Sequence, residues 1–380
     1  MIFPDTQPAL DLVAILLFAG VAQGILLAAT LLTVRRGNRT ANRILSALLG
    51  IFVVHIVLQT LHATNYLFQF PHFSKSNVPL AFLIGPLFYW YVRALTERDF
   101  RLEKKLLWQC LPALGIALWL FPFYIQSAET KIQVLTGDLA NLCRPCVMIA
   151  WLTMIHLLIY FIAAARQLLQ HTRNIKAAFS SLEKINLTWL RTLLLIYAAD
   201  WILALAMQIR SGDAMTANLL WLFVSIVMYV IGYMGLRQPE IFAGIDESTN
   251  GRVQKKKYEK STLAPGKAEE YHPKLLQLMA AEKPYLNSAL NLPNLAKRLS
   301  ISSHHLSQII NERLQQNFFE FVNGYRVDEA RRLLHEPAQR HLNIAQIGYD
   351  AGFSSTSAFN AAFKKHAGTT PSQFRQRQLI

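Results

Sequence analysis

The chain has 380 residues, of which 53% are hydrophobic and 16% charged, and its formal net charge is +15. Its mean hydropathy of +0.24 is higher than soluble domains usually show, and three cysteines are too few for a disulfide scaffold. Residues 1–236 carry 18 Lys/Arg against 10 Asp/Glu, and residues 237–380 carry 20 against 13, so a single nucleic-acid-binding arm does not account for the positive charge.

Seven apolar stretches occupy the first two thirds of the chain. A helix needs about 20 apolar residues to cross about 30 Å of hydrocarbon. Seven such runs would be hard to house in one aqueous core, so the sequence predicts a seven-helix transmembrane bundle rather than a large soluble helical domain. The start of the chain, MIFPDTQPAL, lacks the basic residues of a cleavable signal peptide, and we expect the first stretch to be retained. The seven stretches are 10–34, 44–61, 78–95, 106–125, 142–165, 187–209 and 216–236.

The charge of the loops predicts the orientation of these helices. Thirteen Lys/Arg lie in or beside the loops that follow the first, third and fifth stretches, and four lie in or beside the alternate loops. Lys and Arg accumulate on the cytoplasmic side of a membrane. We therefore expect a multi-pass protein of a bacterial inner membrane, with its N-terminus outside and everything after residue 236 in the cytoplasm.

Few residues within the stretches carry chemistry. Gly20 and Gly24 form a small-residue face that suits close helix packing, within the bundle or between two copies of the chain. Asp200 lies inside the sixth stretch, where a charge is costly; it either ties two helices together by a hydrogen bond or senses a signal. Cys143 and Cys146, in Cys-Arg-Pro-Cys, are either a reactive dithiol or two incidental cysteines. These last three residues are the candidates for signal sensing.

Residues 243–270 have the composition of a flexible linker. They mix Gly, Ser, Thr and Pro with a Lys run, and Arg252 and Lys255–Lys257 are placed either to touch anionic lipid headgroups or to remain solvated. Helical periodicity resumes at Tyr271. The sequence therefore predicts an amino-terminal membrane domain over 1–242, a cytoplasmic linker over 243–270 and a separate helical domain over 271–380.

Residues 291–314 predict a helix-turn-helix unit. Pro293 suits a first helical turn and Ser302 is a suitable N-cap for the second helix. Three apolar residues of that second helix fall on one face: Leu306, Ile309 and Ile310. The opposite face has short polar groups and amides with hardly any acid, a surface that can enter a major groove: His304, His305, Ser307, Gln308 and Asn311.

The same pattern recurs over residues 343–366. Gly352 can adopt the left-handed turn that ends the first helix, and Ser354 or Ser355 begins the second. Phe359 and Phe363 face inward, which leaves Thr356, Ser357, Asn360, Lys364 and Lys365 outward. A helix over 318–335 joins the two units; at about 1.5 Å per residue it is about 27 Å long. Such a rod can hold two recognition helices near one DNA turn, about 34 Å, apart.

Residues 275–377 resemble the DNA-binding domain of AraC/XylS-type transcription regulators. The resemblance rests on Leu299, Leu306, Ser307, Ile310, Asn311, Phe318, Phe321, Asn323, Arg326, Ala330, Leu333, Leu334, Ile344, Ala345, Gly352, Phe353, Ser357, Phe359, Phe363, Lys364, Gly368, Pro371, Phe374 and Arg375. The amino-terminal part departs from members with a soluble effector domain. Its GPLFYWYVRAL stretch and KYEKSTL junction are similar to those of membrane-embedded members.

The resemblance implies binding to double-stranded promoter DNA through both units. By position, the implied base contacts are His304, Ser307, Gln308, Thr356, Ser357, Asn360 and Ala361, and the implied phosphate contacts are Ser303, Asn311, Ser355, Lys364 and Lys365. Ala361 stands where some members have a long basic side chain, which predicts weaker direct base recognition by the second unit. Arg326 corresponds to a position that is mostly structural.

Together these patterns predict a membrane-bound, one-component transcription regulator, a candidate activator. The expected partners are promoter DNA, the lipid bilayer and an unknown small-molecule or envelope signal, with RNA polymerase and a second copy of the chain as further candidates. The alternative is a transporter or channel with a regulatory DNA-binding tail. The chain contains no His-Glu-x-x-His, Gly-x-Ser-x-Gly, phosphate-loop or dinucleotide motif. We therefore expect no enzyme activity, no cofactor and no metal site.

Overall fold

Every element described by the computed structural model is a helix. The structure describes residues 10–34, 38–97, 100–136, 144–182, 187–210, 214–237 and 267–377. Within these ranges there is no strand, and a single isolated bridge joins Phe179 to Asn291. The predicted all-α class, with long apolar helices followed by a helix-turn-helix region, is confirmed.

The chain divides into two compact units. Unit 1 consists of Met1–Leu169 and Leu187–Glu240, and unit 2 consists of Gln170–Asn186 and Ile241–Ile380. The sequence analysis assigned all of residues 1–242 to one domain. In the structure, by contrast, the short stretch Gln170–Asn186 belongs with the carboxyl-terminal residues.

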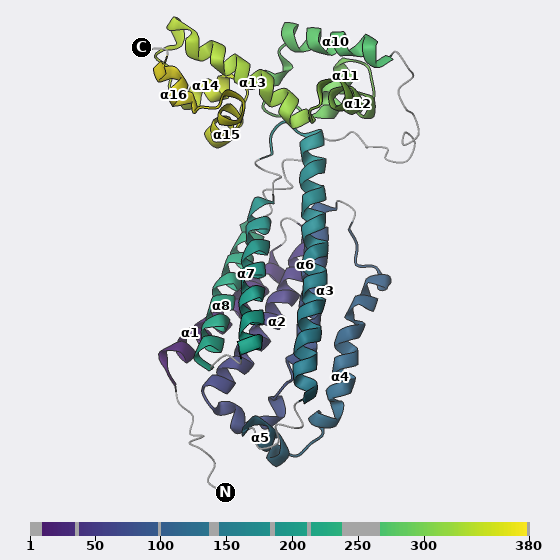
Figure 1. Cartoon of the computed structure of the whole chain (residues 1–380), viewed down its shortest axis with the longest axis vertical. Coiled ribbons are helices and arrows are strands. Elements are labelled where there is room, and N and C mark those ends of the chain that lie inside the picture. Colours follow the sequence, from purple (N-terminus) through teal and green to yellow (C-terminus); the bar gives the residue numbers. More distant parts are fainter. Residues whose placement is uncertain are drawn as a thin grey trace. The chain divides into compact units, whose positions relative to one another are not determined.

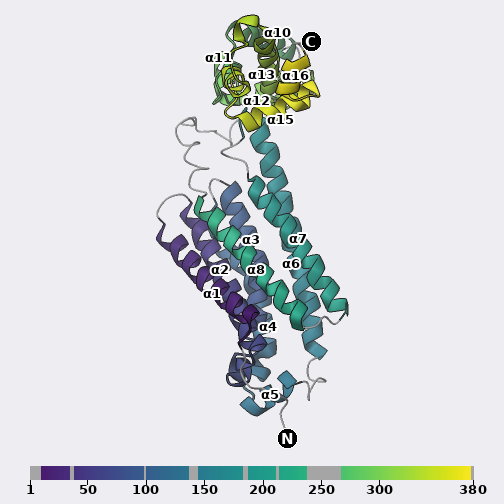
Figure 2. The same cartoon turned by 90° about the vertical axis from the view of Figure 1, so that its left-hand side faces the viewer.

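Unit 1 is built from long apolar helices (Figures 1 and 2). Seven helical segments are long and apolar enough to cross a membrane, judged by length and composition. Many of their large apolar side chains, such as Leu26, Leu118 and Ile159, are exposed, which is unusual for a surface that meets only water. The helices are α1 (Leu12–Thr33), α2 (Arg39–Ala63), α3 (Val78–Thr96), α4 (Leu111–Tyr124), the short α5 (Ala128–Thr136), α6 (Arg144–Ala178), α7 (Thr188–Arg210) and α8 (Ala214–Arg237).

The small-residue face of α1 is used inside unit 1. Gly20 and Gly24 are both buried. A Cβ atom on Gly20 would lie 2.9 Å from the Ser225 Cβ of α8, and one on Gly24 would lie 2.6 Å from the Val53 Cγ2 of α2. Because these distances are shorter than real Cβ contacts, the absence of side chains is what allows α1 to pack against both helices.

Two helices differ from their predicted extents. The fourth apolar stretch begins with a 3-10 helix, Lys104–Cys110, before α4, since Pro112 in the next turn lacks an N–H and restricts the residue before it. The structure extends α6 to Ala178, well beyond the predicted end at residue 165. Hydropathy falls after residue 165 while helical periodicity continues, because Leu168 and Ile175 are buried among polar neighbours. A prediction based on a continuous run of apolar residues therefore ends this helix too early.

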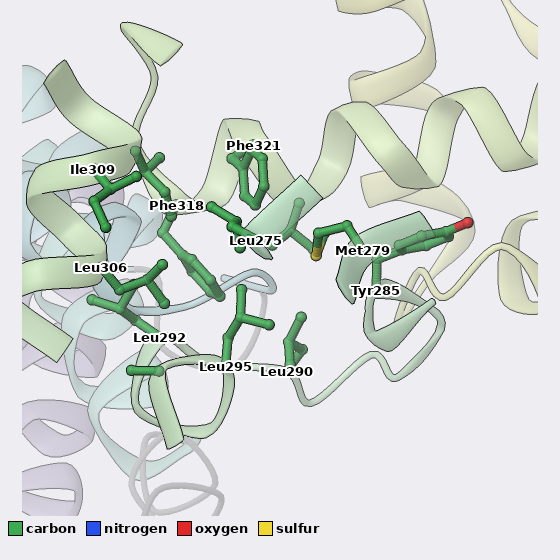
Figure 3. Close-up of a cluster of buried hydrophobic side chains, with 13 residues drawn as sticks. Leu275, Met279, Tyr285, Leu290, Leu292, Leu295, Leu306, Ile309, Phe318 and Phe321 are labelled. Carbon is green, nitrogen blue, oxygen red and sulfur yellow. The ribbon is translucent and has the colours of Figure 1, made fainter. Parts of the chain in front are cut away.

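Unit 2 contains seven described helices arranged around two hydrophobic cores. Part of the first core, with Leu275, Phe318 and Phe321, is shown in Figure 3. The second core includes Val327, Phe359 and Phe363. The long helix α13 contributes to both cores and so joins them. The helices are α10 (Lys267–Ala281), α11 (Leu292–Arg298), α12 (Ser303–Leu314), α13 (Phe318–His335), α14 (Ile344–Asp350), α15 (Thr356–Ala367) and α16 (Pro371–Arg377).

The predicted linker overlaps the start of unit 2's first helix. Residues 267–270 are helical because α10 begins at Lys267, with Glu269 and Glu270 in its first turn. Acidic side chains there interact favourably with the positive end of the helix dipole. Residues 243–266 of the predicted linker lie outside the described residues.

Candidate nucleic-acid interface

The first helix-turn-helix unit consists of α11 and α12. The Asn291 side chain caps α11 by accepting a hydrogen bond from Asn294 N at 2.9 Å, and Ser302 caps α12 by accepting one from His305 N at 3.1 Å. Between the helices, Ser300 has a φ of 56°, in the left-handed region. Leu306, the first apolar residue of α12, is fully buried, as are Ile309 and Ile310. The opposite face of α12 is therefore left free for recognition.

The second unit consists of α14 and α15, and its turn depends on Gly352. This residue has a φ of 93°, and a Cβ atom on it would lie 2.3 Å from the Tyr285 carbonyl oxygen. Both the backbone conformation and the close approach require glycine. Ser355, one of the two predicted caps, begins α15 by accepting a hydrogen bond from Ala358 N at 3.1 Å. Phe359 and Phe363 are fully buried, as predicted.

The residues predicted to contact DNA lie on the recognition helices α12 and α15 or at their starts. His304, Asn311, Ser357, Asn360, Ala361, Lys364 and Lys365 are exposed, and Ser303, Ser307, Gln308, Ser355 and Thr356 are half-buried. In both views these two helices lie on the same side of α13 (Figures 1 and 2). The two recognition helices therefore share one side of the connecting helix.

Several of these side chains already have partners within unit 2. Gln308 Nε2 donates to Glu312 Oε1 at 3.0 Å, and Asn311 Nδ2 donates to Ser307 Oγ at 3.3 Å. Lys365 forms an ion pair with Glu320 of α13, and this hydrogen bond is the main cause that holds the pKa of the Glu320 carboxyl below its usual value. Among the described residues, none forms an ion pair with Lys364. Lys364 is therefore the candidate phosphate contact with the freest charge.

Arg326 of α13 is buried at the centre of unit 2, with 1% of its surface exposed. Its Nε donates to the Tyr285 carbonyl oxygen at 2.8 Å, and its Nη2 donates to the Asn287 carbonyl oxygen at 2.9 Å. Both acceptors lie in the segment between α10 and α11. Burial lowers the pKa of Arg326 to about 10, so the guanidinium is still protonated at neutral pH. Such a side chain organises the domain and is not placed to touch a base.

Two further N–H groups of Arg326 donate to Ser180, a contact that the sequence pattern did not predict. Arg326 Nη1 donates to the Ser180 carbonyl oxygen and Nη2 to Ser180 Oγ, each at 3.0 Å. Ser180 follows α6 directly and belongs to unit 2. The sequence signal that could have led to it is the helical spacing of Leu168 and Ile175, which carries α6 beyond its apolar part.

Unit 1 contains an apolar cavity of about 370 Å³. Its lining includes His55, which is buried, donates a hydrogen bond from Nδ1 to the Ile51 carbonyl oxygen at 2.9 Å, and stacks on Trp221 with ring centroids 5.6 Å apart. Phe161 and Trp201 also line it. A cavity of this size and character suits a small, mostly apolar molecule.

The side chains of the three predicted sensing residues are not among those that the structure describes. Cys143 lies outside the described residues, and the side chains of Cys146 and Asp200 lie outside them as well, although both residues are within helices α6 and α7. Among the residues that the structure describes, no group of three or more His, Cys, Asp or Glu side chains is arranged to hold a metal ion.

Comparisons with known proteins match unit 2. A family model described as a helix-turn-helix domain matches residues 295–377. The HTH-type transcriptional regulator GlxA of Rhizobium meliloti is 32% identical over 106 residues, which are 28% of this chain and 32% of that protein. The Msm operon regulatory protein of Streptococcus mutans is 34% identical over 89 residues, 23% of this chain and 31% of that protein. The match therefore spans about a third of the length of these two relatives.

A shorter relative is covered more fully. The probable transcription factor PqrA of Proteus vulgaris is 32% identical over 90 residues, which are 24% of this chain and 71% of PqrA. Most of that protein thus corresponds to the part of this chain that forms the two helix-turn-helix units.

Proposed function

The chain belongs to the AraC/XylS-type transcription regulators through its carboxyl-terminal unit, and on that premise we propose that it is a membrane-bound, one-component regulator. Unit 2 binds promoter DNA, and the apolar helices of unit 1 hold the protein in a bilayer and respond to a signal there. The observation that carries the proposal is the covalent union, in one chain, of seven apolar helical segments and two helix-turn-helix units.

Sequence-specific binding is assigned to α12 and α15. The proposed base contacts are His304, Ser307, Gln308, Thr356, Ser357, Asn360 and Ala361, and the proposed phosphate contacts are Ser303, Asn311, Ser355, Lys364 and Lys365. Their exposure and their common side of α13 support this assignment. Because α13 joins both helix-turn-helix units, a single copy of the chain can contact two successive major grooves.

The test combines chromatin immunoprecipitation with membrane fractionation. Full-length protein is crosslinked to DNA in cells, and the membrane fraction is then immunoprecipitated. We expect enrichment at a small set of promoters, with the full-length protein in the membrane fraction. Enrichment at no promoter would contradict DNA recognition, and full-length protein in the soluble fraction would contradict the membrane assignment.

The orientation is tested separately. A tag at Ile380 is expected to resist a membrane-impermeant protease in intact cells stripped of their outer envelope, because the loop charges place the carboxyl-terminal unit in the cytoplasm. Digestion of that tag before lysis would place unit 2 on the wrong side of the membrane for DNA. The same proteins inserted into vesicles would transport no solute, which distinguishes a regulator from the transporter alternative.

Replacing Lys364 by alanine is expected to weaken binding to all DNA sequences alike. Each phosphate contact contributes about 0.9 to the slope of log affinity against log salt. We therefore expect the slope to fall by about that amount while the ratio of specific to non-specific affinity is unchanged. The measurement is a salt titration of DNA binding by fluorescence anisotropy with the full chain. Lys274→Ala removes the same charge from α10, where Lys274 pairs with Glu270 of its own helix, and is expected to leave the slope unchanged.

The cavity of unit 1 is the proposed site of the signal. Because it is apolar, we expect the purified protein to retain a small apolar molecule that solvent extraction and mass spectrometry detect. Ala150→Phe fills part of the cavity and is expected to reduce the retained molecule by about tenfold or more, which is about 1.4 kcal/mol of binding. Ala206→Phe adds the same group at an exposed position of α7 outside the cavity. If both variants retained equal amounts of the apolar molecule, the cavity would not be its binding site.

A further inference from the structure

Residues Phe179–Ser181 contact residues of both helix-turn-helix units, and the set of residues that holds this segment is called the crevice below. Phe179 forms a backbone bridge with Asn291, the cap of α11. Ser181 Oγ lies 2.7 Å from the Oγ of Ser354, which precedes the cap of α15. Three consecutive residues therefore touch the start of both units. The crevice is formed by Leu290 and Asn291, by Asn323 and Arg326 of α13, and by Ser354.

Ser180 is the most deeply held residue of the three, with 1% of its surface exposed. Its N–H donates to the Leu290 carbonyl oxygen at 3.4 Å, and its hydroxyl donates to the same oxygen. Its own carbonyl oxygen accepts from Asn323 Nδ2 at 3.3 Å and from Arg326 Nη1 at 3.0 Å. Backbone and side chain are both bonded, so the segment is specifically docked rather than merely in contact.

Ser180 presents two oxygen atoms to Arg326 in the arrangement in which a phosphate group would present them. Its carbonyl oxygen and its Oγ accept from two different nitrogens of one guanidinium, each at 3.0 Å. A phosphate group offers two oxygens to a guanidinium in the same forked manner. The docked serine therefore uses donors that would suit a DNA phosphate, and among the described residues no carboxylate accepts a hydrogen bond from Arg326.

The docked segment lies on the side of the unit that has to face DNA. In both views, α12, α15 and the end of α6 lie on one side of α13 (Figures 1 and 2). A duplex that presents successive major grooves to the two recognition helices must carry its backbone past the space between them. Phosphates also bind preferentially at helix starts, and the segment approaches Ser354 beside the start of the twelve-residue helix α15.

We propose that Phe179–Ser181 is an internal competitor of the DNA backbone, so that docking of this segment in the crevice and binding of promoter DNA exclude each other. This rests on the proposed function and specifies how that function is controlled. Because the segment continues α6, whose residues up to Leu169 belong to unit 1, a rearrangement of that helix can withdraw it. On withdrawal, a backbone phosphate replaces Ser180 as the acceptor for Arg326.

The test locks the segment in the crevice. In a full-length protein whose three native cysteines are replaced by serine, the double variant Ser181→Cys/Ser354→Cys is oxidised in detergent micelles. The two Oγ atoms it replaces are 2.7 Å apart, close to the length of about 2.05 Å of a disulfide, so we expect the crosslink to form within one chain. Affinity for a promoter duplex, taken from the immunoprecipitated sequences, is then measured at one salt concentration before and after reduction.

We expect oxidation to lower DNA affinity at least tenfold and reduction to restore it. Ser181→Cys alone, treated identically, controls for the oxidant and should bind equally in both states. Failure of the crosslink to form would overturn the docked geometry, and unchanged affinity of the crosslinked protein would overturn the exclusion. A reduced protein that binds no promoter DNA at all would instead contradict the proposed function, so the two failures are distinguishable.

A second variant is expected to raise DNA affinity, whereas the crosslink lowers it. Ser180→Ala removes the hydroxyl that bonds Leu290 and Arg326 but leaves the backbone contacts, and it is expected to tighten DNA binding by about threefold to tenfold. A residue with a purely structural role would, on removal, weaken binding or leave it unchanged, and either result would contradict the competition. Thr192→Ala, which removes an exposed hydroxyl of α7, is the matched control and should not alter affinity.

Discussion

Replacing Arg326 by alanine is expected to destabilise unit 2 by about 3–5 kcal/mol, the cost of removing one partner from a buried charged network. The guanidinium supplies hydrogen bonds to the Tyr285, Asn287 and Ser180 carbonyl oxygens. Alanine removes the donor that the structure gives the Tyr285 carbonyl oxygen and one of two donors to each of the Asn287 and Ser180 carbonyl oxygens. It also leaves the volume of the side chain empty. Against a typical domain stability of about 5–15 kcal/mol, we expect a large loss of DNA binding together with faster amide exchange in α13.

The measurement is hydrogen exchange of the full-length protein, read separately in α13 and in the helices of unit 1. Arg332→Ala is the matched control, because Arg332 lies on the same helix with 53% of its side chain exposed, pairs with the exposed Glu336, and shares its second partner, the buried Glu329, with Lys283. Exposed pairs contribute about 0–1 kcal/mol. Arg326→Lys keeps the positive charge but lacks the planar set of N–H donors of the guanidinium. We therefore expect an increase in amide exchange that is intermediate between those of the two alanine variants. Equal exchange in Arg326→Ala and Arg332→Ala would contradict the structural role.

Local chemistry explains why the two helix-turn-helix units could be predicted from the sequence. The caps Ser302 and Ser355, the left-handed Gly352 and the inward Phe359 are each determined by a neighbour within a few residues or by helical periodicity. These local features predict the same helices and turns whatever the rest of the protein contains. The apolar segments are predictable for the same reason, since length and hydropathy are local properties.

The crevice could not be predicted in this way because its partners are distant in sequence. Ser180 lies 146 positions before Arg326, and a serine after an amphipathic helix has no local feature that marks it as buried. Its role arises only when α6 continues into unit 2 and when the segment holding Tyr285 and Asn287 encloses the same guanidinium. The cavity of unit 1 could not be predicted for the same reason, since His55 and Trp221 come from helices far apart in the chain.

Replacing Gln308 and Asn360 together by alanine is expected to remove about 2–6 kcal/mol of discrimination between the promoter sequence and unrelated DNA. Each carboxamide presents a donor and an acceptor, the pair that recognises adenine in the major groove, and one good base contact contributes about 1–3 kcal/mol. Gln308 Nε2 donates to Glu312 Oε1 at 3.0 Å, and its Oε1 is buried without a hydrogen-bond partner among the described residues, so contact with a base requires this side chain to rotate away from Glu312. Asn360 is exposed on α15.

The effects of the two single variants should add, because the residues lie on separate recognition helices and share no hydrogen-bond partner among the described residues. Affinity for unrelated DNA should change little, since phosphate contacts dominate it. The measurement is the affinity ratio between a promoter duplex and a scrambled duplex at one salt concentration, for both single variants and the double variant. Gln316→Ala, an exposed amide beyond the end of α12, is the control. If the double variant kept the wild-type ratio, base recognition would belong to other residues, and α12 and α15 would serve only to position the protein on the DNA backbone.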